Sequence, residues 1–275
     1  MGSPLRSLCR IVLYLGWTLL MLPLQAVAMS LGLPQARAIP RYYHRICCAI
    51  IGLKLEVRGA MAGDGPILFI SNHTSYIDIS VLGAVIRGSF VAKAEVRSWP
   101  FFGTLARLQR TVFVERRAPR QAAAQRDMIA GRLAGGDNLI LFPEGTSNDG
   151  NRILPFKSTL FSVAQAEIDG QPVTVQPISI AYTRLDGMPM GRNLRPLFAW
   201  YGDMEMGFHL WRMLGLGSLT VVIDFHDPIT IAEFGTRKAL AEHCQKVIAN
   251  GLANALSGRA GHAPALETGV APATG

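Results

Sequence analysis

The chain of 275 residues is apolar for a soluble enzyme, because 49% of its residues are hydrophobic, only 17% are charged and the mean hydropathy is +0.26. Its formal charge is +8, and because no basic run is interleaved with aromatic residues, this excess favours an anionic lipid surface over nucleic acid as a partner. The four cysteines form no CxxC pair, which argues against a thiolate metal site or a disulfide framework.

Residues 1–52 are predicted to form a helical segment that anchors the protein to the membrane. Residues 11–36 carry no charge, and as a helix this 26-residue run would be ~39 Å long. It would cross a ~30 Å hydrocarbon layer, although Pro23 and Gln25 interrupt it and leave a kinked or interfacial helix open. Residues 26–28 also resemble a signal-peptide cleavage site, which would place the mature terminus at Met29. A second apolar stretch, residues 42–53, predicts a short helix packed on the first or lying along the interface.

In residues 67–78 an apolar strand runs into a polar turn. Residues 67–70 predict a buried strand, and His73 follows its carboxyl end, where open α/β sheets commonly keep their reactive groups. Thr74 or Ser75 is predicted to cap the next helix by accepting a backbone N–H. Asp78 follows His73 by five residues, so its carboxylate can reach back to one imidazole nitrogen and leave the other free as a base.

Residues 139–147 repeat this layout. Residues 139–142 predict a strand, and Pro143 ends it because proline cannot donate a hydrogen bond to the ladder. Glu144 then presents a carboxylate, and Gly145 allows a tight backbone path. The chain thus carries two strand-to-turn segments with polar groups after the strand.

The remaining elements alternate between strands and helices. Lys93 at a strand end and Lys157 near the second turn are candidates for binding an anionic group. Residues 201–216 are apolar and predict core, a membrane contact or the lining of a groove. The alternation predicts an α/β fold with a mixed, largely parallel sheet flanked by helices over residues 53–256, followed by a disordered tail at residues 257–275. Strands are expected at residues 53–57, 89–93, 111–114, 173–181 and 219–225, and helices at residues 77–86, 99–108, 119–133, 156–166 and 237–255.

Four short blocks occur in a fixed order: NHTSYID at residues 72–78, TVFVER at 111–116, FPEGT at 142–146 and VQPI at 175–178. As a set they resemble the glycerolipid acyltransferase family, which includes the lysophosphatidic acid acyltransferases. The resemblance implies a membrane-binding helical hairpin ahead of the α/β domain, and acyl-CoA or acyl carrier protein as thioester co-substrate without a further cofactor. It also implies that Arg116, Glu144, Gly145 and Thr146 help to bind the acceptor head group.

An acyltransferase of this kind must deprotonate an acceptor hydroxyl as it attacks a thioester carbonyl, and His73 is suited to take that proton near neutral pH. Asp78 would stabilise the charged ring as the acid does in a Ser-His-Asp triad, while the acceptor hydroxyl takes the place of the serine. The chain has no GxSxG motif, which disfavours a serine hydrolase, and the His73–Asp78 pair lacks a third ligand, so no metal is predicted.

The sequence departs from the family pattern at Ser147, where the third block usually continues with an arginine. The family's commonest acceptor, 1-acyl-sn-glycerol-3-phosphate, is the first prediction and would give phosphatidic acid. The alternative acceptor is lyso-ornithine lipid, because FPEGTSNDG followed by LPFKS resembles the bacterial branch that acylates it and that acceptor carries no phosphate. Arg152 and Lys157 lie near the missing cation in sequence.

Two alternatives belong to other classes: a non-catalytic membrane lipid-binding protein, and a lysophospholipase that uses water as the acceptor. The intact His73, Asp78 and Glu144 argue against the first of these. The expected location is the bacterial inner (cytoplasmic) membrane, with the active site on the cytosolic face. Membrane lipids, a lysolipid acceptor and the acyl donor are the expected partners, and nucleic acid is not.

Overall fold

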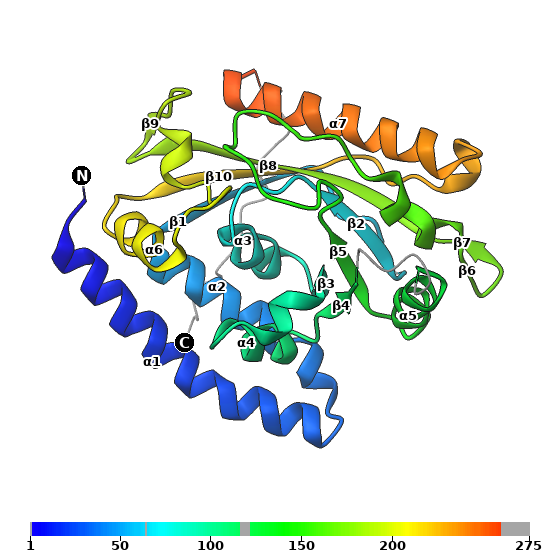
Figure 1. The fold of residues 1–275 in the computed structure, drawn as a ribbon, viewed down its shortest axis with the longest axis horizontal. Helices are drawn as coiled ribbons and strands as arrows, with labels where there is room; N and C mark the ends of the chain where they lie inside the picture. The colour runs from blue at the N-terminus through cyan, green and yellow to red at the C-terminus, as the bar shows by residue number, and fades with distance from the viewer. Residues whose placement is uncertain (1, 64, 116–121, 260–275) are drawn as a thin grey trace, which may run out of the picture.

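A sheet of eight strands organises the described part of the chain, which in this computed structural model comprises residues 2–63, 65–115 and 122–259 (Figure 1). Its β10–β8 and β8–β9 pairs are antiparallel and its other neighbouring pairs are parallel, so the predicted mixed, largely parallel sheet is confirmed. The strand order is β1 (Leu53–Arg58), β10 (Leu219–Phe225), β8 (Thr174–Leu185), β2 (Ile67–Ser71), β5 (Asn138–Leu141), β3 (Gly88–Lys93) and β4 (Val112–Val114), with β9 (Met188–Pro189) paired to β8. A separate hairpin joins β6 (Glu167–Ile168) and β7 (Gln171–Pro172).

Both faces of the sheet are covered, which explains why residues 67–70 of β2 are all apolar. Ile67 and Phe69 belong to one hydrophobic cluster, whereas Leu68 and Ile70 belong to another. Successive side chains of a strand point to opposite faces, so a strand buried on both faces needs an unbroken apolar run. Figure 1 shows α7 above the sheet and α2 and α3 below it. The first cluster includes residues of α2 (Ile39–Ile51), α3 (Ile77–Val85) and α6 (Met206–Leu214); the second includes residues of α5 (Ala122–Ala134), α7 (Arg237–Ser257) and the 3₁₀ helix η4 (Ser158–Gln165).

The long helix α1 (Pro4–Ser30) lies outside α2, α4 (Phe102–Leu108) and α6 (Figure 1). Polar side chains hold it there. Ser7 Oγ donates to Trp211 O at 2.9 Å, Thr18 Oγ1 lies 2.9 Å from the Tyr43 hydroxyl, and Gln25 Nε2 donates to Leu108 O at 2.7 Å. These contacts bring the amino-terminal helix against the α/β layers. Whether residues 1–52 form a separable unit stays a prediction.

The outward face of α1 is apolar, which reverses the usual pattern of a surface helix. Leu5, Leu19 and Val12 are 70%, 68% and 60% exposed, whereas the buried side of the helix contains Ser7, Thr18 and Gln25. Among the described residues, α1 is the one helix long and apolar enough to cross a membrane. An apolar outer face of this size needs a lipid or protein covering.

The structure corrects several local predictions. The cap of α3 is Tyr76 and makes no side-chain cap hydrogen bond, so the predicted capping by Thr74 or Ser75 is wrong. The segment predicted as a helix at residues 156–166 is the 3₁₀ helix η4. The strand predicted at residues 173–181 is longer, because β8 continues to Leu185. Helix α7 ends at Ser257, and residues 260–275 of the predicted tail lie outside the described residues. The short 3₁₀ helices are η1 (Pro34–Arg37), η2 (Ala94–Ser98), η5 (Arg195–Leu197) and η6 (Ile231–Glu233).

Candidate active site

The two polar turns found in the sequence lie side by side because the strands before them are neighbours. β2 and β5 pair in parallel, with Leu68 opposite Leu139 and Ile70 opposite Leu141. The turn after each strand therefore emerges at the same edge of the sheet. A direct contact joins the turns: the backbone N–H of Asn148 donates to His73 O at 3.2 Å. One site thus collects groups that are about seventy residues apart in sequence.

His73 and Asp78 form the predicted pair. Nδ1 of His73 lies 2.8 Å from Oδ2 of Asp78. The imidazole is 22% exposed while the carboxylate is fully buried, and the ring stacks on Phe142 with centroids 4.2 Å apart. Asp78 is bonded to Nδ1 of the imidazole, and Phe142 covers one face of the ring. Nε2 is therefore the nitrogen that can accept a proton from a substrate.

Asp78 is itself held by four hydrogen bonds, which include the one from His73. Its Oδ2 accepts the backbone N–H groups of Thr74 at 2.7 Å and Ser75 at 2.9 Å. Its Oδ1 accepts the Tyr182 hydroxyl at 2.5 Å. Burial and then the negative charge of Asp78 raise the pKa of Tyr182 well above its ordinary value, so the phenol stays protonated and keeps donating. The buried carboxylate therefore has fixed donors on both oxygens and a defined orientation toward His73.

Glu144 is buried beneath the same turn, with only 2% of its surface exposed. Its Oε1 accepts the backbone N–H of His73 at 2.7 Å, and its Oε2 accepts Asn148 Nδ2 at 2.7 Å and Leu154 N at 2.8 Å. Burial raises the pKa of Glu144, while these hydrogen bonds oppose that change. Both oxygens are thus engaged in holding the turn that presents His73. A direct contact between Glu144 and an acceptor head group stays a prediction.

The other predicted residues that the structure describes lie on the turn after β5 and on neighbouring elements. Gly145 has φ of 76°, a left-handed conformation that favours glycine, and the Thr146 side chain beside it is exposed. Lys93 is the last residue of β3, the strand next to β5. Lys157 is exposed just before η4, and its backbone N–H donates to Pro143 O at 3.0 Å. Arg116 lies outside the described residues. Their roles in substrate binding stay predictions.

Ser147, the position that departs from the family pattern, faces the protein. Its hydroxyl donates to Trp200 O, and Trp200 N in turn donates to Thr74 O at 3.0 Å. The serine thus joins the second turn to the segment before α6, beside the turn that carries His73. An arginine at this position would have to give up that local bond.

Three residues that support the His73 and Glu144 turns were not predicted from the sequence. Asn72 pairs with β8 through its side chain, accepting Ile180 N at 2.8 Å and donating to Ile180 O at 2.9 Å, so it extends the sheet beyond Ser71. Asn148 lies within the quoted FPEGTSNDG stretch and was detectable there as a polar neighbour of Glu144. Tyr182 lies 104 residues from Asp78 on β8, and no local signal in the sequence marks it.

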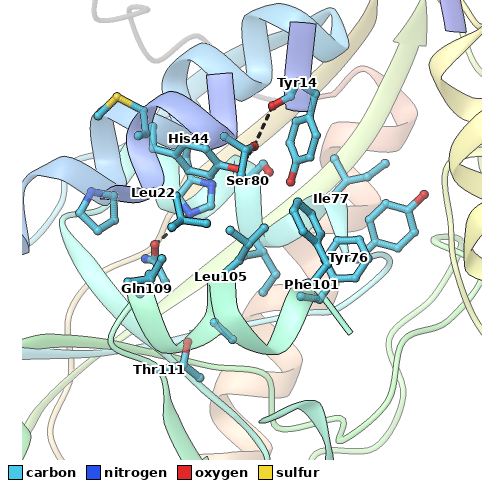
Figure 2. Close-up of a pocket in the computed structure, with 18 of the residues that line it drawn as sticks. Tyr14, Leu22, His44, Tyr76, Ile77, Ser80, Phe101, Leu105, Gln109 and Thr111 are labelled. Atoms are coloured by element: carbon cyan, nitrogen blue, oxygen red, sulfur yellow. Dashed lines mark hydrogen bonds between the residues drawn. The ribbon is translucent and has the colours of Figure 1, made fainter. Parts of the chain in front are cut away.

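An apolar cavity of about 390 Å³ lies between α1, α2, α3 and α4. Figure 2 shows Leu105, Ile77 and Phe101 among its walls, with His44 hydrogen-bonded to Gln109 at 3.0 Å on one side. Tyr76 and Ile77 also line it, three and four residues after His73, so the cavity wall adjoins the turn that carries His73. Among residues 2–63, 65–115 and 122–259, no three His, Cys, Asp or Glu side chains are grouped as metal ligands would be.

Similarity to known acyltransferases agrees with this arrangement of His73, Asp78 and Glu144. The Acyltransferase family model matches residues 54–181. The chain is 44% identical over 245 residues to a lyso-ornithine lipid O-acyltransferase of Brucella abortus, an alignment that covers 88% of this chain and 92% of that protein. It is 33% identical over 202 residues to a 1-acyl-sn-glycerol-3-phosphate acyltransferase of Neisseria gonorrhoeae, covering 73% and 75% of the two chains.

A solved structure shares the fold. The crystal structure of the 1-acyl-sn-glycerophosphate acyltransferase from Thermotoga maritima superposes with a TM-score of 0.57 at 20% identity, over 92% of this chain and 99% of that one. At this identity the likeness concerns the fold alone, and the sequence relatives carry the assignment. The chain belongs to the acyltransferase family that includes lyso-ornithine lipid and 1-acyl-sn-glycerol-3-phosphate acyltransferases, and it is an O-acyltransferase.

Proposed function

We propose that the protein transfers an acyl group from a thioester to the free hydroxyl of a lysolipid, with His73 as general base. Nε2 of His73 takes the hydroxyl proton as the oxygen forms a bond to the thioester carbonyl carbon. When the intermediate collapses, the carbon–sulfur bond breaks and the imidazolium returns its proton to the leaving thiolate. The observation that carries the proposal is the 2.8 Å contact between His73 Nδ1 and the fully buried Asp78 carboxylate.

Asp78 stabilises the imidazolium that forms during the reaction, because its charge lies beside Nδ1 throughout. Glu144 supports the same step indirectly by holding the backbone N–H of His73. The site residues are preorganised by buried hydrogen bonds, so little reorganisation is needed when the charge develops. These features favour a transferase over a non-catalytic lipid-binding protein.

Of the two acceptors that the sequence left open, we propose lyso-ornithine lipid. The relative of that name is 44% identical, against 33% for the Neisseria gonorrhoeae enzyme that acts on 1-acyl-sn-glycerol-3-phosphate. Ser147 supports the same choice, because its hydroxyl is bonded to Trp200 and supplies no cation for a phosphate. A charge-assisted hydrogen bond is worth roughly 1.5–3 kcal/mol, so the missing cation weakens phosphate recognition without excluding it. 1-Acyl-sn-glycerol-3-phosphate is the second candidate.

The apolar cavity is the proposed place for an acyl chain. Its volume of about 390 Å³ lies within the roughly 300–1,000 Å³ range of small-ligand sites. Burial of each methylene there would contribute about 0.8 kcal/mol, so chain length would affect the reaction strongly. The donor, acyl-CoA or acyl carrier protein, is cytosolic, and we therefore propose that the protein acts at the cytosolic face of the bacterial inner membrane, with α1 in contact with the lipid.

A competition assay tests this proposal. Purified protein in mixed micelles receives both acceptors at equal surface concentration, with acyl-CoA or acyl carrier protein as donor, and mass spectrometry identifies the products. We expect acylated ornithine lipid to predominate and the His73→Ala variant to make neither product. A wild type that acylates only 1-acyl-sn-glycerol-3-phosphate would overturn the acceptor assignment. Release of free fatty acid without acylated lipid would identify a hydrolase instead.

A further inference from the structure

A second cavity, of about 260 Å³, lies at the opposite ends of the strands from His73. We call it the arginine cavity; its walls include Arg37, Arg87, Gly88, Arg110, Asp137 and Asn138. Gly88 and Asn138 are the first residues of β3 and β5, whereas His73 follows the last residue of β2. A strand of five residues spans roughly 17 Å, so the arginine cavity is separated from the catalytic turn by about one strand length.

The arginine cavity has an excess of positive charge. Asp137 accepts both Nη atoms of Arg110 at 3.0 and 2.8 Å and Nε of Arg132 at 2.6 Å, and Nε of Arg37 lies 3.2 Å away. Burial raises the pKa of Asp137, but the hydrogen bonds and charges of Arg132 and Arg110 outweigh it and hold that pKa below its ordinary value. One carboxylate cannot neutralise three guanidinium groups. The cavity therefore keeps unbalanced cations around a fixed centre.

Further arginines extend this charge along α2. Arg41 and Arg45 both donate from Nε to Ala84 O, at 3.4 and 3.2 Å. Arg87 follows Ala84 by three residues and is exposed at the cavity wall. Because they share Ala84 O as acceptor, the Arg41 and Arg45 guanidinium groups lie close together. Burial and then the charges of Arg45 and Arg87 lower the pKa of Arg41. Among the described residues, no ion pair joins Arg41, Arg45 or Arg87 to a carboxylate.

The arginine cavity adjoins the apolar surface that faces outward from α1. Ala36 and Arg37 of η1 line it, and Gln25 of α1 donates to Ala36 O at 3.0 Å. Between α1 and η1, Leu31 and Leu33 are 67% and 41% exposed. Exposed leucines next to exposed arginines match the two layers of a membrane surface, hydrocarbon and head group.

We propose that the arginine cavity binds the phosphate group of an anionic membrane lipid. A guanidinium group can hold two phosphate oxygens at once, which suits a site lined by arginines. Both Nη atoms of Arg110 are bonded to Asp137, and Arg37 bonds Asp137 through Nε and Gly135 O through Nη2 at 2.8 Å. Among the described residues of the cavity wall, Arg87 and Nη1 of Arg37 are therefore the arginine donors left for a phosphate. The volume, about 260 Å³, is below the roughly 300–1,000 Å³ of sites that enclose a whole small ligand, and it suits a head group whose chains remain in the bilayer. The bound lipid would anchor the end of the α1–α2 segment at a set depth in the membrane.

The test is calorimetric titration of the full-length protein in neutral detergent with short-chain phosphatidylglycerol, short-chain phosphatidylcholine and inorganic phosphate. The variant is Arg37→Gln/Arg87→Gln, which alters two cavity arginines whose side chains reach the surface. The matched control is Arg237→Gln/Arg259→Gln. Both arginines are exposed, Arg237 as the first residue of α7 and Arg259 two residues after its end, and α7 covers the other face of the sheet (Figure 1). Thermal unfolding checks that all three proteins are folded.

We expect phosphatidylglycerol to bind the wild type and the control alike, and the cavity variant roughly 10- to 30-fold more weakly, because each basic residue near an anionic surface is worth about fivefold. Phosphatidylcholine, which carries no net charge, should bind all three weakly and equally. An equal loss in the control would show non-specific charge attraction and overturn the proposal. Inorganic phosphate binding as tightly as phosphatidylglycerol would assign the cavity to a soluble phosphate compound instead.

Discussion

The charge of Asp78 should control turnover, and the structure allows that charge to be removed with little other change. In Asp78→Asn, the amide oxygen can stay at the Oδ2 position and keep the Thr74 and Ser75 N–H groups. The amide nitrogen then faces the Tyr182 hydroxyl, which can accept a hydrogen bond as well as donate one. The turn should therefore keep its shape while the imidazolium loses its counter-charge.

The size of the effect follows from the geometry. With Nδ1 and Oδ2 2.8 Å apart, the two charge centres are separated by about 4 Å, and at an effective dielectric constant of about 20 they attract by roughly 4 kcal/mol. If the pair is fully charged only in the transition state, its loss lowers kcat by about 10³-fold. Because the site is partly open to solvent, a fall of about 10²-fold is the lower bound we expect.

The assay is single-turnover transfer to the acceptor, measured alongside the unfolding temperature of each variant. The double variant His73→Ala/Asp78→Asn should be no slower than His73→Ala, because Asp78 acts through the imidazole and the two losses overlap. A folded Asp78→Asn protein that keeps more than about one tenth of wild-type kcat would refute this reasoning, since one tenth corresponds to only ~1.4 kcal/mol. Additive losses in the double variant would do the same.

Three further changes test the supports of the site. Tyr182→Phe leaves Oδ1 of a fully buried carboxylate without its donor, which should cost about 1–3 kcal/mol in unfolding free energy and lower kcat; unchanged denaturation and kcat would contradict the hydrogen bond. Glu144→Gln keeps one acceptor oxygen but turns an amide N–H toward a backbone N–H donor. We expect kcat to fall about tenfold with KM unchanged, whereas a rise in KM alone would indicate contact between Glu144 and the head group. Leu105→Trp fills part of the apolar cavity, so transfer of long acyl chains should fall relative to short ones in a chain-length series, and an unaltered preference would place the acyl chain elsewhere.

The sequence determined the local elements and the pairing of His73 with Asp78 because their signals are themselves local. An unbroken apolar run marks β2 as a strand buried on both faces, and this holds in the structure. His73 and Asp78 are five residues apart, so a strand, a turn and a helix start suffice to bring them together. The second turn is recognisable for the same reason, because Pro143 marks the end of a strand and Gly145 marks a left-handed backbone conformation.

Tertiary structure alone decided the partners of these groups. Tyr182 reaches Asp78 because β8 pairs with β2 and continues past the end of β2. That pairing depends on the order of strands in the sheet, which neither segment determines by itself. The predicted cap by Thr74 or Ser75 failed because α3 begins at Ile77, which puts Tyr76 at the cap position. The backbone N–H groups of Thr74 and Ser75 donate to the Asp78 carboxylate instead. The role of Glu144 under the His73 turn likewise follows from the parallel pairing of β2 and β5.

The amino-terminal helix shows the same division. Its length and lack of charge are visible in the sequence, and they predict a membrane helix. Which side of α1 faces the protein is decided by packing: Ser7, Thr18 and Gln25 find partners on α6, α2 and near α4, and the leucines are left outside. Hydrophobicity is a property of each residue and can be read in order along the chain, whereas a hydrogen-bond partner exists only once the chain has folded.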